Sequence, residues 1–389
     1  MLNKDKGIYF ENLDALRAVA AFFVVFFHIS HWFDYPKTKF YDSFRYLISF
    51  GGQGGVLGVT FFFILSGFLI TYLMLVEQSK NGSLNVPFFY YRRMIRIWPL
   101  YYLTLIVGFL IYPLISFLNG YKYSENSSVL LYSLFMVNFD NLFNGSPSIG
   151  ILGVQWSVAI EEQFYLLWPI FFVFFNRRNI FPFLLVFVIV LSELFYLKAP
   201  SSDIGYYHLI SNFRFLAFGA LIAYLSYFKR SWINFFLNNI NPNINFFIYL
   251  ICILILFFNQ RLVESFFYFK YINQIIPFLF FGFIIVDQNF SNKSFFKIGR
   301  SNILSWLGKI SYGLYMTHMI AIYIVISLSS YMDQLHVGWK IIFSVILTIV
   351  ISYLSFHYIE TYFLSLKNKY ETINKTLNLN LTKRKRNNN

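Results

Sequence analysis

The first long apolar stretch of the chain, LDALRAVAAFFVVFFHIS, contains an arginine and a histidine, Arg17 and His28. On an α-helix these positions differ by about 20° around the axis and about 16 Å along it, so both side chains lie on one face. A central arginine in a membrane-spanning helix costs at least about 2.5 kcal/mol, and such residues by default face a protein-lined cavity where they have a function. Because a histidine can take a proton from a hydroxyl nucleophile, the pair indicates a buried site with a general base.

His31 lies one helical turn beyond His28, so position along the helix does not decide which histidine acts. The alternative for His28 is a structural histidine held by hydrogen bonds. The arginine on the same face favours the functional interpretation.

Three arginines precede a proline in the stretch YYRRMIRIWPLYY: Arg92, Arg93 and Arg96. Arg93 and Arg96 are three residues apart and share a helix face, which suits bidentate capture of phosphate groups. The alternative is a positive-inside signal flanked by interfacial aromatic residues.

A third polar stretch, WSVAIEEQFY, begins at Trp156 and places Ser157, Glu161 and Tyr165 on one stripe of a helix. An acid in an apolar span needs a partner, so we expect Glu161 to hold a histidine or an arginine. Two adjacent acids at a helix start are also typical of surface residues that complement the helix dipole.

The remaining polar residues of apolar segments lie towards the end of the chain. Tyr315 and His318 share a helix face, and Glu360 near the inner end of the last span is expected to pair with a cytoplasmic arginine. For Glu193 and Arg214 we expect a structural pair.

The composition excludes a soluble domain, because 58% of the 389 residues are hydrophobic and only 12% are charged. Apolar runs recur along the whole chain, which predicts an all-α, polytopic membrane bundle of about ten spans. The predicted spans are 13–33, 56–76, 97–118, 154–175, 180–198, 207–228, 245–260, 271–288, 303–329 and 339–364. The segment 127–139 is too short for a span and is predicted to be interfacial or re-entrant.

The formal charge of +14 suggests nucleic acid at first, but the basic residues are placed as topology signals, so we expect no nucleic-acid partner. With both termini cytoplasmic, the arginines at 92–96 and the basic clusters at 177–178, 229–230, 293–300 and 383–386 all fall on one side. Residues 367–389 are expected to form a disordered basic cytoplasmic tail. The first apolar segment has its small residues before the apolar run, where a signal peptide has them after it, so we interpret it as a retained span.

A single cysteine, Cys252, excludes a disulfide framework and a thiolate-rich metal site within one chain. The sequence contains no GxSxG elbow, no HExxH, no Walker loop and no acidic cluster, so hydrolase, zinc peptidase and ATPase functions are not indicated and no metal is expected.

Taken in order, these stretches resemble the acyltransferase-3 family, membrane proteins that O-acylate bacterial surface glycans. The resemblance rests on Arg17 with His28, FFILSGFL over 62–69, RRMIRIWP over 92–99, WSVAIEEQFY over 156–165, ISYGLY over 310–315 with His318, and YIE over 358–360. Together these motifs cover residues 8–366 and define one transmembrane domain.

The resemblance implies transfer of an acyl group, most often acetyl, from cytoplasmic acetyl-CoA to a hydroxyl of a cell-surface polysaccharide or its lipid-linked precursor. The CoA ester is a substrate, and no permanently bound cofactor is implied. Arg92, Arg93 and Arg96 would hold the CoA phosphates. His28 would act as general base or as a transient acyl carrier, Arg17 would position the donor or stabilise developing negative charge, and Glu161 would orient a cationic partner. The supporting residues would be Ser66, Trp156, Ser157, Tyr165, Tyr315, His318 and Glu360.

Two departures from the family pattern stand out. Tyr362 stands where the family has a proline after its final glutamate. Some members also carry an external esterase-like domain, so here an acyl relay is expected to be absent or supplied by a separate periplasmic or extracellular protein. The principal alternative function is a transporter or flippase for a glycan or lipid intermediate in the plasma membrane.

Overall fold

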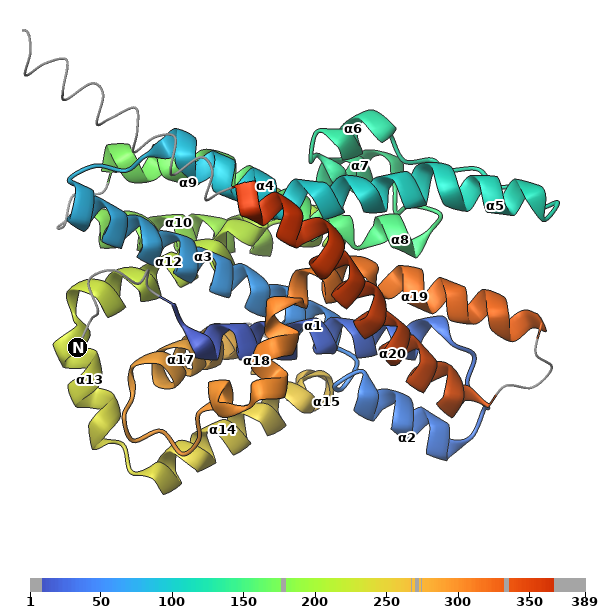
Figure 1. The fold of residues 1–389 in the computed structure, drawn as a ribbon. Helices are drawn as coiled ribbons and strands as arrows, with labels where there is room; N and C mark the ends of the chain where they lie inside the picture. Colours follow the sequence, from blue (N-terminus) through green and yellow to red (C-terminus); the bar gives the residue numbers. More distant parts are fainter. Residues whose placement is uncertain are drawn as a thin grey trace, which may run out of the picture.

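The computed structural model of the chain describes residues 9–366 apart from 176–179, 267, 270–272, 274 and 332–335. Secondary structure within these residues is entirely helical (Figure 1). The longer helices are α1 (Glu11–Trp32), α3 (Gly54–Asn81), α4 (Val86–Ile106), α9 (Gln155–Phe175), α10 (Phe181–Leu197), α12 (Leu209–Phe228), α14 (Pro242–Phe257), α17 (Ile275–Phe290), α19 (Ser311–Tyr331) and α20 (Val337–Ser355). The shorter ones are α2 (Lys39–Ile48), α5 (Tyr112–Leu118), α6 (Val129–Ser133), α7 (Val137–Asn144), α8 (Gly150–Gly153), α11 (Ser202–Tyr207), α13 (Arg230–Asn239), α15 (Asn259–Ser265) and α18 (Asn302–Lys309). Three further turns are the π-helices η1 (Val107–Ile111) and η3 (Phe356–Glu360) and the 3₁₀ turn η2 (Ile298–Arg300).

Seven helical stretches of the described chain are long and apolar enough to cross a membrane by length and composition, or eight if one bent pair counts as a span. They are Glu11–Trp32, Gly54–Asn81, Val86–Leu118, Gly150–Phe175, Ser202–Phe228, Ser311–Ser329 and Val337–Leu366. The prediction of a polytopic helical membrane bundle is therefore confirmed. Two of the ten predicted spans are shorter apolar helices, α10 with 17 residues and α17 with 16.

One predicted span is bent sharply against the helix before it, and another is divided in the structure. The predicted span 245–260 is α14, which joins α13 at a bend of 94°. The predicted continuous helix 303–329 was wrong, because the chain leaves helical geometry at Ile310 and separates α18 from α19. The segment 127–139 forms α6 and part of α7, helices of five and eight residues that are too short to span a bilayer.

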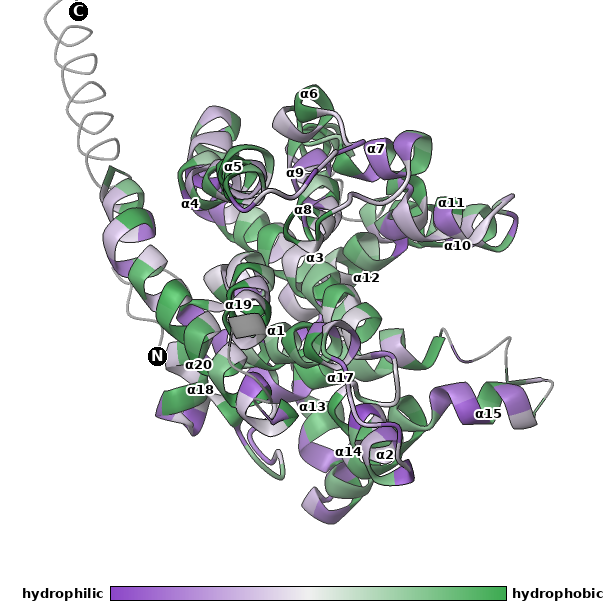
Figure 2. Cartoon of the chain, turned by 90° about the vertical axis from the view of Figure 1, so that its right-hand side faces the viewer, coloured by the Kyte–Doolittle hydropathy of each residue, from purple (hydrophilic) through white to green (hydrophobic). Residues whose placement is uncertain are grey.

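The surface of the bundle is apolar where helices face outward. Phe183 is 76% exposed, Leu110 63% and Leu166 60%, and many other large apolar side chains are equally uncovered. Figure 2 shows hydrophobic residues along the outward faces of the helices, with hydrophilic residues concentrated in short elements such as α13 and α15. Such a surface is stable against lipid and unfavourable in water, as expected for a membrane protein.

Helix α1 lies at the centre of the bundle in both views, between α3 on one side and α18 and α19 on the other (Figures 1 and 2). Close approach of helices in this bundle depends on small residues. A Cβ atom on Gly67 of α3 would lie 1.9 Å from the carbonyl oxygen of Leu216 in α12, and one on Gly219 would lie 2.0 Å from that of Ile64. Contact between these two backbones therefore requires glycine.

Helices α10 and α12 are joined by the predicted structural ion pair. Arg214 Nη1 donates to Glu193 Oε2 at 2.8 Å, and the arginine is only 5% exposed. Opposite charges that meet inside an apolar bundle offset much of each other's desolvation cost. The prediction for this pair is confirmed.

The first and last described segments meet at one end of the bundle. Tyr91 at the start of α4 donates a hydrogen bond to the carbonyl oxygen of Leu366 at 3.4 Å. Tyr9 and Leu364 line the same pocket. Both ends of the described chain thus lie beside the arginines of α4. The predicted basic tail, 367–389, lies outside the described residues.

Candidate active site

The N-terminal half of α4 positions the three arginines. The side chain of Asn85 caps this helix by accepting the amide N–H of Phe88 at 3.0 Å, which fixes where the helix begins. Arg92 donates to Glu77 of α3 at 2.8 Å and lies over the ring of Phe88. Arg92 is therefore neutralised by an acid.

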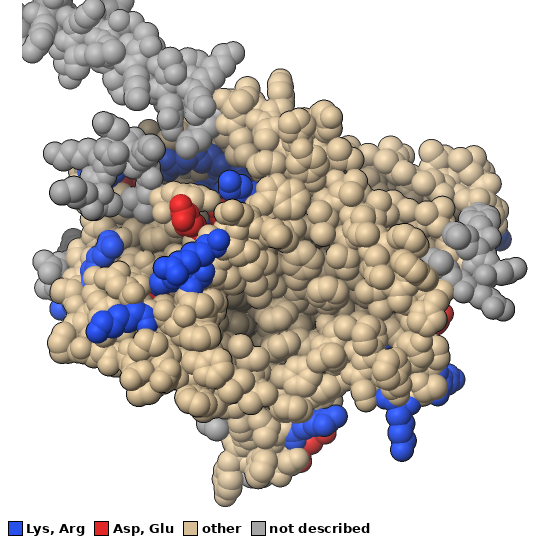
Figure 3. Space-filling view, turned by 60° about the horizontal axis from the view of Figure 1, so that its bottom comes forward, with Lys and Arg blue, Asp and Glu red and all other residues tan. Residues whose placement is uncertain are grey.

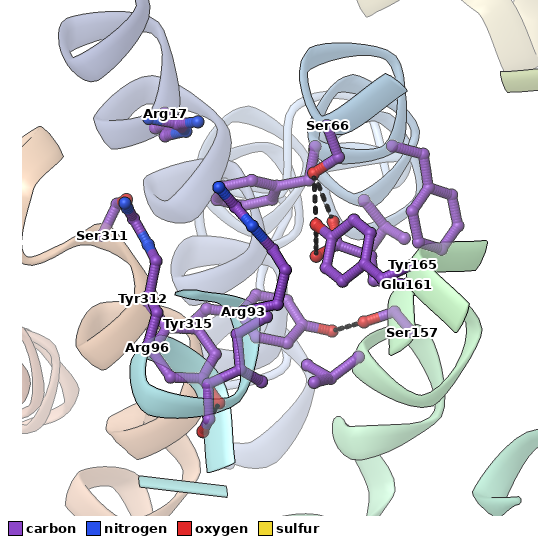
Figure 4. A pocket seen from close by; sticks show the side chains of 15 residues that line it. Arg17, Ser66, Arg93, Arg96, Ser157, Glu161, Tyr165, Ser311, Tyr312 and Tyr315 are labelled. Carbon is purple, nitrogen blue, oxygen red and sulfur yellow. Dashed lines mark hydrogen bonds between the residues drawn. The ribbon is translucent and has the colours of Figure 1, made fainter. Parts of the chain in front are cut away.

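Arg93 and Arg96 instead face a pocket inside the bundle (Figure 4). This inner pocket has a volume of about 710 Å³ including its opening, and it is lined by Arg17, Val59, Phe62, Phe63, Ser66, Arg93, Arg96, Ile97, Ser157, Val158, Glu161, Tyr165, Ser311, Tyr312 and Tyr315. Arg17, Arg93 and Arg96 lie on one side of it, and Ser66, Glu161 and Tyr165 lie on the other (Figure 4). Residues from α1, α3, α4, α9 and α19 thus meet in one place, as the sequence predicted for most of them.

Glu161 is held by hydroxyl groups. Ser66 donates to Glu161 Oε1 at 2.8 Å, and Tyr165 donates to Oε2 at 2.9 Å. Among the described residues no cation lies within ion-pair distance of Glu161, so its expected direct contact with an arginine or histidine is not present. Its carboxylate faces the arginines across the pocket instead (Figure 4).

A second hydroxyl pair closes the pocket between α9 and α19. Tyr315 Oη donates to the carbonyl oxygen of Val154 at 2.9 Å, so the 2.7 Å contact with Ser157 is donated by the serine. Trp156 does not line the pocket. It is 6% exposed and packs against Phe63, Tyr206 and Tyr207.

Arg17 has an acidic partner that the sequence analysis did not identify. Its Nη1 atom lies 3.1 Å from Asp14 Oδ1, one turn earlier in α1, and Tyr9 donates to Asp14 Oδ2 at 2.5 Å. The hydrogen bond to Asp14 raises the pKa of Tyr9 to about 12. The only signal in the sequence was an i, i+3 acid and base pair at a helix start.

An outer pocket adjoins the inner one, and the two share Arg17 and Arg96. Its lining comprises Tyr9, Phe10, Leu13, Asp14, Arg17, Leu69, Leu73, Arg96, Lys309, Phe356, Glu360 and Leu364. Glu360 is 4% exposed and its Oε1 atom has no hydrogen-bond partner. Within the described chain it forms no ion pair, so its expected contact with an arginine is not present. Figure 3 shows basic side chains gathered along one edge of a mostly uncharged face, around a hollow beside acidic side chains.

His28 lies near the other end of α1 and does not line either pocket. Its Nδ1 atom is 3.2 Å from Nε2 of His318, which is completely buried in α19. His31 is exposed and contacts only its own helix, through the carbonyl oxygen of Phe27 and the hydroxyl of Ser30. Of the two histidines in α1, His28 is therefore the one that faces the bundle.

Among the residues that the structure describes, no three His, Cys, Asp or Glu side chains lie together as the ligands of a metal ion would. Cys252 is a free, half-buried thiol. The polar groups of the pockets are cations, carboxylates and hydroxyls, a set suited to an anionic organic substrate.

These features define a class: a multi-pass helical membrane protein with cations and acids gathered in a buried pocket. Comparison with known protein families shows which family of this class the chain matches. The acyltransferase domain of the acyltransferase-3 family matches residues 10–357, most of the chain. The chain belongs to this family, as its motifs indicated.

The chain is also similar in sequence to several curated O-acetyltransferases. The chain is 28% identical over 377 residues to the peptidoglycan O-acetyltransferase OatA of Listeria monocytogenes, covering 91% of this chain and 55% of that protein. It is 27% identical over 379 residues to the putative peptidoglycan O-acetyltransferase YrhL of Bacillus subtilis, covering 90% and 54%. A putative O-acetyltransferase of Staphylococcus aureus is 27% identical over 394 residues, with 93% and 59% covered. The chain thus spans little more than half the length of these relatives, and no solved structure matches it.

Proposed function

We propose that the protein is a membrane O-acetyltransferase, which takes an acetyl group from acetyl-CoA at the arginine end of the bundle and transfers it to a hydroxyl of a surface glycan. One observation carries the proposal. The pocket lined by Arg93 and Arg96 extends to Tyr315, one turn of α19 before His318, which His28 contacts. A pocket lined by cations and a pair of histidines therefore lie at neighbouring levels of one bundle, which supports a donor site beside a base.

The donor would enter through the outer pocket. CoA carries phosphates at one end and a thioester at the end of a narrow pantetheine arm, so it suits a cationic mouth that leads to a narrower interior. Arg96 and Lys309 would contact the phosphates, and Arg17 and Arg93 would lie further along the arm. Arg92 is less suited to this role than the sequence suggested, because Glu77 neutralises it.

The acceptor would approach from the His28 end. Its hydroxyl oxygen forms a bond to the thioester carbonyl carbon while His28 takes the hydroxyl proton. The carbon–sulfur bond then breaks, CoA leaves as a thiolate, and the proton on His28 returns to the sulfur. The products are an O-acetyl ester and CoA, and atoms and charge balance. Arg17 lies about 16 Å from His28 along α1 and pairs with Asp14, so of the two roles expected for it we assign it to positioning the donor.

The relatives narrow the acceptor class. The names of two of them specify peptidoglycan, so a peptidoglycan strand or its lipid-linked precursor is the first acceptor to test. The arginine end would face the cytoplasm, since acetyl-CoA is made there and basic segments favour that side. Both termini would then be cytoplasmic and the protein would lie in the plasma membrane.

The test is acetyl transfer by the purified full chain in proteoliposomes that contain labelled acetyl-CoA and peptidoglycan fragments or a lipid-linked glycan. The expected result is a base-labile label on the glycan with release of an equal amount of CoA. Movement of the glycan across the bilayer without consumption of acetyl-CoA would instead support the transporter alternative.

A further inference from the structure

Two histidines from distant parts of the sequence meet inside the bundle. His28 of α1 and His318 of α19 have ring centroids 4.9 Å apart, and His318 Nε2 lies 3.2 Å from His28 Nδ1. His318 is 0% exposed, so both of its ring nitrogens need partners within the protein.

The neighbouring carbonyl groups define which nitrogen of each ring carries the proton. His318 Nδ1 lies 2.6 Å from the carbonyl oxygen of Tyr315, and His28 Nδ1 lies 3.0 Å from that of Val24. A carbonyl oxygen only accepts, so both Nδ1 atoms carry hydrogen. His318 Nε2 is then an acceptor facing His28, and the basic lone pair of His28 is on Nε2, the atom turned away from the pair.

His318 Nε2, at 3.2 Å, is a second acceptor for the Nδ1–H group of His28 beside the carbonyl oxygen of Val24, at 3.0 Å. The carbonyl oxygen of Val24 already accepts the backbone N–H of His28 in the regular hydrogen bonding of α1. His318 Nε2 has no other hydrogen-bond partner among the described residues. The Nδ1–H group is therefore shared, with the His318 nitrogen as the acceptor that is otherwise unused.

We propose that His318 is the positioning residue of the acyl transfer: it accepts the Nδ1–H group of His28 and thereby keeps His28 Nε2 free to take the acceptor hydroxyl proton. The inference rests on the proposed function, in which His28 is the base. When His28 becomes an imidazolium, its Nδ1–H bond to His318 strengthens and stabilises the charge. His318 itself neither gains nor loses a proton and does not touch the substrates.

Two substitutions separate positioning from a structural role. In His318→Gln the amide oxygen reaches the place of Nε2, so the variant keeps an acceptor for His28 but not the donor to Tyr315. In His318→Asn the amide reaches only the place of Nδ1, so the variant keeps the bond to Tyr315 but loses the acceptor. We expect His318→Asn to lower kcat at least about tenfold with the donor KM unchanged, and His318→Gln to restore most of the loss. Equal activity of the two variants, or better activity of the Asn variant, would overturn the inference.

A spectroscopic measurement does not depend on these variants folding. The chain has six histidines, so ¹⁵N-histidine labelling gives few imidazole signals. Solid-state spectra of the parent protein are expected to show His28 protonated on Nδ1 and a ¹⁵N–¹⁵N correlation to His318 Nε2. Protonation of His28 on Nε2 contradicts the inference even if acyl transfer occurs. Absence of acyl transfer in a parent protein that shows this correlation contradicts the proposed function instead.

Discussion

Individual charges in the bundle fall into two groups, those with an acidic partner and those without one. Arg92 pairs with Glu77, Arg17 with Asp14 and Arg214 with Glu193. Arg93 and Arg96 form no ion pair within the described chain, and the Nε atom of Arg93 has no hydrogen-bond partner. A guanidinium group inside a membrane protein is costly without a counter-charge, so these two arginines favour an anionic ligand.

This division gives a matched pair of variants. Arg96→Gln should weaken acetyl-CoA binding by about tenfold, because one charge-assisted contact to a phosphate is lost, whereas Arg92→Gln should change it little. The measurement is a binding titration of purified protein at two salt concentrations, and salt should weaken donor binding in the parent protein. Equal effects of the two substitutions would indicate that both arginines act only as positive-inside topology signals.

The histidines of α1 provide a second pair. His28→Ala should lower acyl transfer by about 10²- to 10⁴-fold with nearly normal donor binding, because a general base contributes on that scale. His31→Ala should have a much smaller effect, since His31 is exposed and contacts only its own helix. Transfer rates and acetyl-CoA affinity of both variants check this. If the His31 variant is inactive and the His28 variant is normal, His31, one helical turn further on, is the base instead.

The sequence predicted all four charged residues of the inner pocket because charged groups are rare in apolar segments and are therefore conspicuous there. It did not predict Asp14, since an acid in the first turn of a helix is also typical of dipole complementation. It placed Lys309 inside a span, since Gly308, two residues before the break at Ile310, is not by itself enough to end a predicted helix. The contact between His28 and His318 could not be predicted, because 290 residues separate them and no rule of spacing relates α1 to α19.

At the scale of helices, the pocket depends on how closely α3 can approach its neighbours. α3 carries Ser66 on the pocket side and Gly67 against α12. The glycine allows the backbones to touch, and the side chain of the preceding residue, Ser66, reaches Glu161. The packing of α3 against α12 and the position of the Ser66 hydroxyl in the pocket therefore depend on two adjacent residues.

Gly67→Ala should destabilise the protein by more than about 2 kcal/mol, because the added methyl group would overlap the carbonyl oxygen of Leu216 and backbone atoms cannot move aside cheaply. Gly153→Ala is the control, since its Cβ atom would meet nothing closer than 3.7 Å. Thermal unfolding of both variants in detergent measures the difference. An unchanged midpoint for Gly67→Ala would show that α3 and α12 pack less closely than in this structure.

Helix boundaries were the least predictable part of the fold. Hydropathy located all ten apolar segments, but it does not report the direction of a helix. The 94° bend between α13 and α14 falls at Asn241 and Pro242, which mark a helix start but not its angle. The lengths of α10 and α17 likewise depend on the capping and tertiary contacts that end each helix. Such endings depend on the neighbours of a residue more than on its own type.

At the scale of the whole molecule, the two ends of the bundle carry different groups. The arginines of α4, the start of α1 and the last turns before Leu366 lie at one end, and the polar interior leads from there towards the histidine pair. One substrate that enters at each end would meet the other within the bilayer.

The prediction at this scale concerns sidedness. In sealed vesicles of known orientation, CoA should appear only on the face that carries the arginine end, and the acetylated glycan should appear on the opposite face or within the bilayer. Separate assay of CoA thiol and of esterified glycan on each side measures this. Release of both products on the arginine side would contradict a donor and an acceptor that enter from opposite ends.

The outer pocket is lined by Tyr9 from the first described segment and by Leu364 from the last. During synthesis on the ribosome its walls therefore come together only after the final helix has emerged and inserted. Until then the lining of the outer pocket is incomplete. If this pocket takes the donor, as proposed above, incompletely translated chains would bind no acetyl-CoA.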